Sequence, residues 1–86
     1  MHYLYILKSK VNGELYIGNT GNIKKRLEEH NSGKQKATKR YKPWKIVYLE
    51  GYFSENDAKI REHNLKYFGK AYSQLKRRIK NSLQES

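Results

Sequence analysis

Residue types that suit chemistry on a phosphate recur in order along this sequence. Arg26 and His30 follow Tyr16 by ten and fourteen residues, and Tyr5 precedes Tyr16 by eleven. An arginine stays protonated and can bond two phosphate oxygens at once. Glu62 comes later, and one carboxylate with water and a substrate phosphate is an ordinary way to bind Mg²⁺. The combination therefore raises the question of catalysis on a phosphate.

Each of these residues also has a simpler structural interpretation when it is taken alone. A lone histidine is more often a surface or half-buried residue than a catalyst, a helical arginine is usually solvated, and tyrosines are usually packed aromatics. Glu62 and Arg61 interrupt an apolar stripe formed by Ala58, Leu65 and Phe68. At the edge of that stripe Glu62 would pair with Lys59 or Lys66, a contact worth about 0.2–0.5 kcal/mol. Only the combination favours a functional site.

A β-hairpin is the first element that would position these residues. HYLYILKS and ELYIG are rich in tyrosine and large apolar residues, and an Asn-Gly pair typical of a two-residue turn separates them. With Asn12 and Gly13 as the turn, Val11 faces Glu14 and Ser9 faces Tyr16. Side chains alternate along a strand. This alternation places on one face Tyr3, Tyr5, Leu7, Tyr16 and Gly18.

A short helix after the hairpin would carry the arginine and the histidine. Thr20 or Asn22 is its expected N-cap, and its apolar stripe consists of Ile23 and Leu27. Arg26 and His30 are four residues apart, so they project from one side of the helix next to that stripe. We expect the turn to bring both side chains beside Tyr16.

The second half of the chain predicts one loop, one strand and two helices. Residues 33–43 are rich in Lys and Arg, lack acids and read as an exposed basic loop. The strand that follows places Trp44, Ile46 and Tyr48 on one face and Val47 and Leu49 on the other. Apolar residues on both faces predict a sheet that is covered on both sides.

A capping box at Ser54 and Asp57 opens the first of these helices, which runs to about Phe68 and stops at Gly69. The last helix extends from about Ala71 to Leu83. The order is ββαβαα, an α/β (α+β) class with a small three-stranded antiparallel sheet flanked by helices. We expect residues 1–86 to form a single domain.

Composition favours a polyanionic partner. Nineteen Lys and Arg residues against eight Asp and Glu residues give a net charge of +11, and eight tyrosines suit stacking on bases. A solvated basic surface is the alternative. There is no cysteine, so a disulfide framework and a cysteine-ligated zinc site are excluded. No apolar stretch approaches a membrane span, and we expect a soluble, cytoplasmic protein without a membrane partner.

Taken together, the spaced residues resemble the GIY-YIG nuclease family. Residues 3–5, YLY, stand at the family's first tripeptide but lack its Gly and Ile, and residues 16–18, YIG, are an intact second tripeptide. Arg26, His30 and a glutamate in the next long helix, Glu62, follow in the family's order. The chain is most similar to the short stand-alone members, which resemble the catalytic modules of homing and excision-repair endonucleases.

The resemblance implies hydrolysis of a phosphodiester bond in DNA with one divalent metal, Mg²⁺ or Mn²⁺. It implies that Tyr16 is the general base and that Glu62 is the sole protein ligand to the metal. It also implies that Arg26 stabilises charge on the pentacovalent phosphate. Tyr5 would orient the nucleophile or the scissile phosphate, and His30 would assist proton transfer or bond the base. A phenol needs nearby positive charge for such a role.

Other expectations concern the partner. The cations expected to bind nucleic acid are Lys24, Lys25, Lys34, Lys36, Lys39, Arg40 and Arg77. Asn81 is the best match to a late asparagine of the family. RNA remains open beside DNA, and a homodimer could contact two strands. Two other functions stay open: a nucleic-acid-binding module without useful catalysis, and a structural or protein-interaction domain.

Overall fold

A computed structural model describes residues 1–84, so the last two residues of the expected single domain lie outside the described part. The elements, in chain order, are β1 (His2–Ser9), β2 (Leu15–Thr20), α1 (Ile23–Asn31), the 3₁₀ turn η1 (Lys39–Tyr41), β3 (Trp44–Tyr52), α2 (Glu55–Tyr67), α3 (Gly69–Arg78) and α4 (Lys80–Gln84). The three-stranded sheet is antiparallel, as the sequence predicts, and its strand order is β2-β1-β3. No helix within residues 1–84 is long and apolar enough to cross a membrane.

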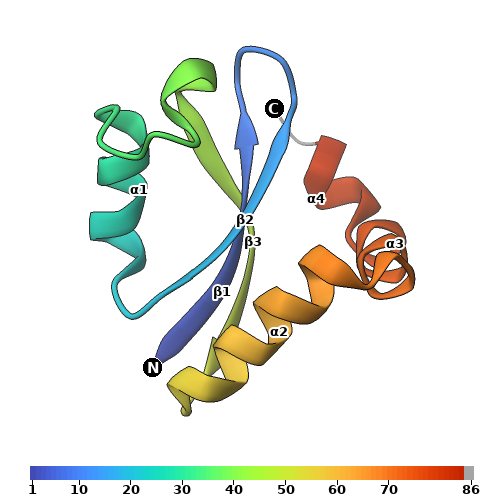
Figure 1. Ribbon diagram of the computed structural model, residues 1–86. Coiled ribbons are helices and arrows are strands. Elements are labelled where there is room, and N and C mark those ends of the chain that lie inside the picture. The colour runs from blue at the N-terminus through green and yellow to red at the C-terminus, as the bar shows by residue number, and fades with distance from the viewer. Residues whose placement is uncertain (85–86) are drawn as a thin grey trace.

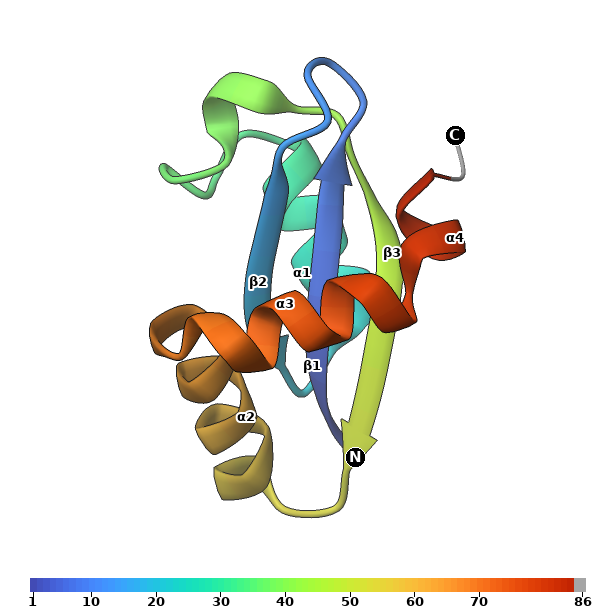
Figure 2. The same ribbon diagram turned by 90° about the vertical axis from the view of Figure 1, so that its right-hand side faces the viewer.

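Two layers of helices cover the sheet (Figure 1). On one face lie α2, α3 and α4, and on the other lie α1 and the segment that contains η1; Figure 2 shows α3 crossing in front of the strands with α1 behind them. The larger core, on the first face, consists of Leu4, Ile6, Ile17, Leu65, Leu75 and Ile79. The smaller one, on the α1 face, consists of Tyr5, Leu7 and Trp44. The prediction of a sheet covered on both sides is confirmed.

The hairpin has a longer connection than the Asn-Gly pair predicts. Leu7, and not Ser9, pairs with Tyr16, and the Ser9 amide donates to the Glu14 carbonyl at 2.8 Å. The four residues between them form the turn, because the Ser9 hydroxyl accepts hydrogen bonds from the backbone amides of Val11 and Asn12. The slip is two residues, an even number, so the prediction that Tyr5 and Tyr16 share a face still holds.

A β-bulge in β3 overturns the predicted alternation of that strand. Ile46 pairs with Leu7, whereas Tyr48 pairs with Ile6, so Val47 is an extra residue without an opposite partner. Trp44 and Ile46 therefore pack on the α1 face, while Tyr48 packs against the core under the other helices. The prediction that Trp44, Ile46 and Tyr48 share one face is wrong.

The last two helices also begin and end differently from the prediction. Ser54 is the N-cap of α2, but its side chain makes no capping hydrogen bond. Phe68 has an extended backbone, with φ −118° and ψ 97°, and it separates α2 from α3. Gly69 is the first residue of α3 and not a stop. The predicted helix over 71–83 is broken at Ile79, whose φ of −107° and ψ of 26° lie outside the helical region.

Candidate active site

The Tyr5 phenol lies at the centre of the candidate site, on the α1 face of the sheet. Tyr5 occupies the central strand opposite Gly18 and is 1% exposed. A Cβ atom on Gly18 would overlap the oxygen and ring of this phenol. The glycine of the YIG tripeptide therefore lets the Tyr5 ring cross β2 at close range and reach α1.

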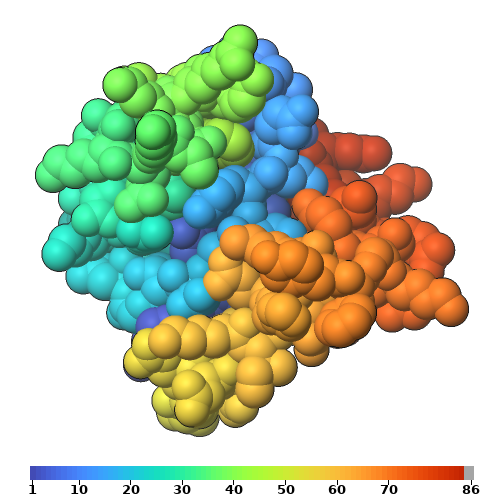
Figure 3. Space-filling view, viewed as in Figure 1, coloured from blue at the N-terminus to red at the C-terminus, as the bar shows by residue number. Residues whose placement is uncertain are grey.

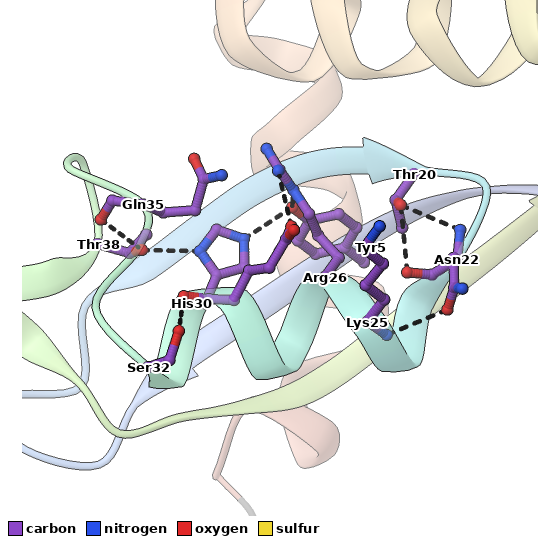
Figure 4. Close-up of polar contacts among 10 residues, drawn as sticks. Tyr5, Thr20, Asn22, Lys25, Arg26, His30, Ser32, Gln35 and Thr38 are labelled. Carbon is purple, nitrogen blue, oxygen red and sulfur yellow. Dashed lines mark hydrogen bonds and ion pairs between the residues drawn. The ribbon is translucent and has the colours of Figure 1, made fainter.

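His30, in the last turn of α1, contacts the Tyr5 phenol. Its Nε2 atom lies 2.9 Å from the Tyr5 hydroxyl, and its Nδ1 atom lies 2.7 Å from the Thr38 hydroxyl (Figure 4). His30 and Thr38 are fully buried. Burial lowers the pKa of His30, and the positive charge of Arg26 lowers it further, against a smaller opposite effect of Glu29. The imidazole is therefore neutral at physiological pH.

Arg26 lies one turn before His30 on the same side of α1, as the spacing predicts. The Asn22 side chain caps this helix by accepting from the Lys25 amide at 3.1 Å. Arg26 donates from Nε to the Tyr5 hydroxyl at 3.4 Å and from Nη1 to Glu29 at 3.3 Å. Burial raises the pKa of Tyr5, and the Arg26 hydrogen bond and charge oppose that shift only in part. Tyr5 therefore holds its proton.

Tyr16 packs beside this buried pair, near the edge of the sheet that β2 forms. Its ring centroid lies 5.0 Å from that of His30 at an interplanar angle of 62°, and 6.4 Å from that of Trp44. Its hydroxyl makes no hydrogen bond within the described residues, so it is free to meet a substrate or water. The Lys66 ammonium lies 5.7 Å from the ring centroid.

Glu62 reaches the same edge of the sheet from α2. Its side chain is 18% exposed, and one of its carboxylate oxygens pairs with Lys66 at 2.6 Å. The pairing of Glu62 with a lysine of its own helix, which the structural interpretation predicts, is therefore present. The other oxygen accepts a hydrogen bond from the side-chain amide of Asn19, whose own oxygen lies 2.9 Å from His2 Nε2. Asn19, the residue directly after YIG, was not predicted as part of the site.

An open hollow lies beside these groups. Its volume is about 450 Å³, and it is lined by His2, Asn19, Thr20, Gly21, Asn22, Lys25, Arg26 and Glu29. Figure 3 shows this side of the molecule, with the α1 and α2 regions on either side of the sky-blue β2 segment. The lining has two cations, Arg26 and Lys25, and one carboxylate, Glu29, which pairs with Arg26 at 3.3 Å, so the charged groups of the hollow are positive on balance.

The other predicted cations lie on two parts of the surface. Four are exposed in the loop that follows α1, namely Lys34, Lys36, Lys39 and Arg40, and Lys24 and Lys25 are exposed on α1. Arg77 and Asn81 lie on α3 and α4, across the sheet from α1, and they contact none of the five predicted catalytic residues. The structure therefore brings together Tyr5, Tyr16, Arg26, His30 and Glu62 without Asn81.

Comparison with known proteins identifies the family. The model of the GIY-YIG catalytic domain matches residues 1–67. The chain belongs to the GIY-YIG family. Its match includes the YIG tripeptide, both tyrosines, Arg26, His30 and Glu62. GIY-YIG domains are typically endonucleases that act on DNA, so membership indicates a nuclease-type function.

Relatives of this GIY-YIG domain include small bacterial proteins. The UPF0213 protein of Staphylococcus haemolyticus is 43% identical over 70 residues, which cover 80% of this chain and 84% of that protein. A UPF0213 protein of Syntrophus aciditrophicus is 44% identical over 72 residues, with 81% and 82% covered. The solution structure of a UPF0213 protein from Bacillus halodurans has a TM-score of 0.54 and 33% identity, and the match covers 86% of this chain and 80% of that one.

Proposed function

We propose that this GIY-YIG domain is a divalent-metal-dependent endonuclease that hydrolyses phosphodiester bonds in DNA. The observation that carries the proposal is the convergence of five side chains from β1, β2, α1 and α2 beside a hollow that Arg26 lines. Four separate elements supply these five residues, and only Arg26 and His30, one turn apart on α1, come from the same element. The net charge of +11 suits a polyanionic substrate.

A single metal-binding carboxylate fits the donors that are present. No group of three or more His, Cys, Asp or Glu residues that could hold a metal occurs within residues 1–84. Mg²⁺ keeps several waters and commonly takes one or two carboxylates together with substrate phosphate oxygens. Glu62 suits that role because Asn19 orients one carboxylate oxygen, while the other pairs with the exposed Lys66 ammonium. We propose that Glu62 would hold Mg²⁺ or Mn²⁺ through its carboxylate.

The chain's own residues would divide the work according to burial. Tyr16 is our proposed general base, since its hydroxyl makes no hydrogen bond within the described residues and Lys66 supplies positive charge near its ring. Tyr5 is buried and keeps its proton, so it positions rather than takes protons. Arg26 would bind the scissile phosphate and stabilise the negative charge that develops there. A divalent ion held by Glu62 would supply Lewis acidity for the reaction.

The second candidate is a nucleic-acid-binding module without catalysis. The exposed cations on α1 and on the loop after it support that function as well as they support a nuclease. The two differ in their dependence on Glu62, because binding through lysines needs no metal ligand. The retained set of Tyr16, Arg26, His30 and Glu62 favours the nuclease.

Cleavage of labelled single-stranded, duplex and branched DNA, with Mg²⁺ or Mn²⁺ and with EDTA, tests the proposal. The matched variants are Glu62→Gln and Glu55→Gln, which change the same group on the same helix. Glu55 is exposed, and within residues 1–84 its only ion pair is with Lys59 at 2.9 Å. We expect metal-dependent cutting that Glu62→Gln reduces at least about 100-fold, a loss of roughly 3 kcal/mol of transition-state stabilisation, and that Glu55→Gln leaves unchanged.

The same experiment separates the candidate functions. DNA binding without cutting on any substrate, equal in both variants, would overturn the nuclease and leave the binding module. Weak binding without a steep salt dependence would overturn both, because neutralised phosphates release counterions in proportion to the number of contacts. Cutting of RNA in place of DNA would overturn the substrate class.

A further inference from the structure

Thr38 is a fully buried polar residue in the middle of an otherwise exposed basic segment. Its hydroxyl lies 2.7 Å from His30 Nδ1, and its carbonyl accepts a hydrogen bond from the Trp44 indole at 2.8 Å. The residues on both sides of it, Ala37 and Lys39, are exposed. The fold therefore inserts this one hydroxyl into the site from a loop that the sequence predicts to be solvated.

The hydrogen-bond donors around Tyr5 determine which nitrogen of His30 carries the hydrogen. The Tyr5 hydroxyl has two partners within the described residues, Arg26 Nε and His30 Nε2. Arginine can only donate, so the phenolic hydrogen has an acceptor only if His30 Nε2 is unprotonated. A buried donor without an acceptor costs about 1–3 kcal/mol. The neutral ring must therefore carry its hydrogen on Nδ1.

That hydrogen on Nδ1 points to Thr38, which must accept it. The Thr38 hydroxyl can do so because its own hydrogen has another acceptor, the Gln35 carbonyl at 3.4 Å. In this arrangement Arg26 donates to the Tyr5 oxygen, and the Tyr5 hydroxyl donates to His30 Nε2. His30 Nδ1 donates to the Thr38 oxygen, and the Thr38 hydroxyl donates to the Gln35 carbonyl. Every polar side-chain atom that is buried in the described residues has a partner in this arrangement.

We propose that Thr38 is a positioning residue that holds His30 in the Nδ1–H tautomer and thereby aims the Tyr5 oxygen at Arg26. With its hydrogen committed to His30, the phenol offers only lone pairs, one to Arg26 and the other to an incoming water. It cannot donate to a phosphate oxygen. This inference rests on the proposed nuclease function, and it selects the nucleophile over the scissile phosphate as the group that Tyr5 orients.

Anchoring of the loop makes this position firm before substrate binds. Asn31 donates to the Trp44 carbonyl at 3.0 Å and accepts from the Trp44 amide at 2.6 Å. Trp44 in turn holds the Thr38 carbonyl. The other titratable and charged groups that face the His30 ring are Tyr5 from β1, Tyr16 from β2 and Arg26 and Glu29 from α1. Within residues 1–84 none of these groups bonds Nδ1, so Thr38 is the residue that accepts the hydrogen on that nitrogen.

The test is the ¹⁵N chemical shifts of the His30 ring at neutral pH in the unaltered protein, Thr38→Val and Thr38→Ser. We expect one neutral tautomer with hydrogen on Nδ1 in the unaltered protein and in Thr38→Ser. Thr38→Val keeps the side-chain volume but offers no acceptor, so a large share of the ring should move its hydrogen to Nε2. For DNA cleavage, Thr38→Val should lower kcat about tenfold and change KM less than about twofold.

The readouts separate this proposal from the function on which it rests. Hydrogen on Nε2 in the unaltered protein would overturn the role of Thr38 even if Thr38→Val does not fold. An unchanged tautomer in folded Thr38→Val would overturn it as well. A merely structural threonine would lower the stability of Thr38→Val without moving the tautomer. If no DNA is cut but the tautomer shifts as expected, the nuclease fails while the positioning by Thr38 stands.

Discussion

Replacing Gly18 with alanine should displace the Tyr5 ring and disassemble the buried pair. A Cβ atom at this position would lie 2.5 Å from the ring carbon Cζ of Tyr5, which is closer than real Cβ contacts allow. The Tyr5 ring cannot move away without disturbing its surroundings, because it is 1% exposed and packs in the core with Leu7 and Trp44. The ring must move, and its 2.9 Å contact with His30 must lengthen.

The expected magnitude combines two effects. Overpacking a close-packed site costs about 1–3 kcal/mol, and leaving the buried Tyr5 hydroxyl or His30 nitrogen unpaired costs about 1–3 kcal/mol more. The total of about 2–6 kcal/mol is a large share of the roughly 5–15 kcal/mol that holds a domain folded. In a domain of this size it should lower Tm by at least about 10 °C.

Urea unfolding and thermal melts of Gly18→Ala and Gly69→Ala measure the effect. Gly69 is the matched control because a Cβ there meets nothing within 4 Å, and alanine at the start of α3 should leave stability unchanged or raise it slightly. Gly18→Ala in a Tyr5→Phe background should lose about 1 kcal/mol less, since the hydrogen bond cannot be lost twice. Equal unfolding midpoints for the two glycine variants would refute the reasoning.

Two further predictions concern the metal carboxylate and the pH range of stability. Asn19→Ala should weaken Mn²⁺ binding about 10- to 100-fold, measured by calorimetry, because Asn19 orients the Glu62 carboxylate. The control is Asn56→Ala, which changes an exposed residue of α2. Equal Mn²⁺ affinities of the two variants would contradict the role of Asn19. Burial alone would raise the pKa of Glu50, but hydrogen bonds from Arg61, Tyr52 and Tyr48 lower it below 4.5, so its contribution is present above pH 4.5 and disappears as pH falls through the lowered value. Burial and the bond to Glu50 raise the pKa of Tyr48 and Tyr52 to about 12, so their contribution is complete below pH 10 and disappears as pH rises toward 12. Glu50→Gln should cost about 1–3 kcal/mol at neutral pH and flatten both limbs in urea titrations; unchanged limbs would show that this cluster does not govern them.

Local patterns were sufficient for the parts of the fold that depend on one element at a time. Arg26 and His30 share a side of α1 because the helical period fixes the direction of residues four apart. Asn22 caps that helix because its side chain reaches the Lys25 amide three residues on. Tyr5 and Tyr16 share a face despite the wrong turn, because strands have a period of two and the slip was even.

The remaining features depend on contacts between segments that are distant in the sequence. The bulge at Val47 arises from the pairing of β3 with β1, so the sequence of β3 alone does not predict it. Asn19 and Glu62 are 43 residues apart, and only the packing of α2 at the edge of β2 joins them. From the sequence Thr38 is expected to be as exposed as its neighbours in the basic loop, but the packing of this loop against His30 buries it.

The sequence by itself determined the family, the order of the three strands and the first two helices, and the identity of the five candidate residues, because residue types and spacing are local properties of a chain. Tertiary structure alone decided how these residues are used. It buried Tyr5 and His30, left the Tyr16 hydroxyl without a hydrogen bond to any of residues 1–84 and brought Thr38 to the imidazole. Burial and hydrogen-bond partners arise from packing across the whole chain, and they determine which atom holds each proton.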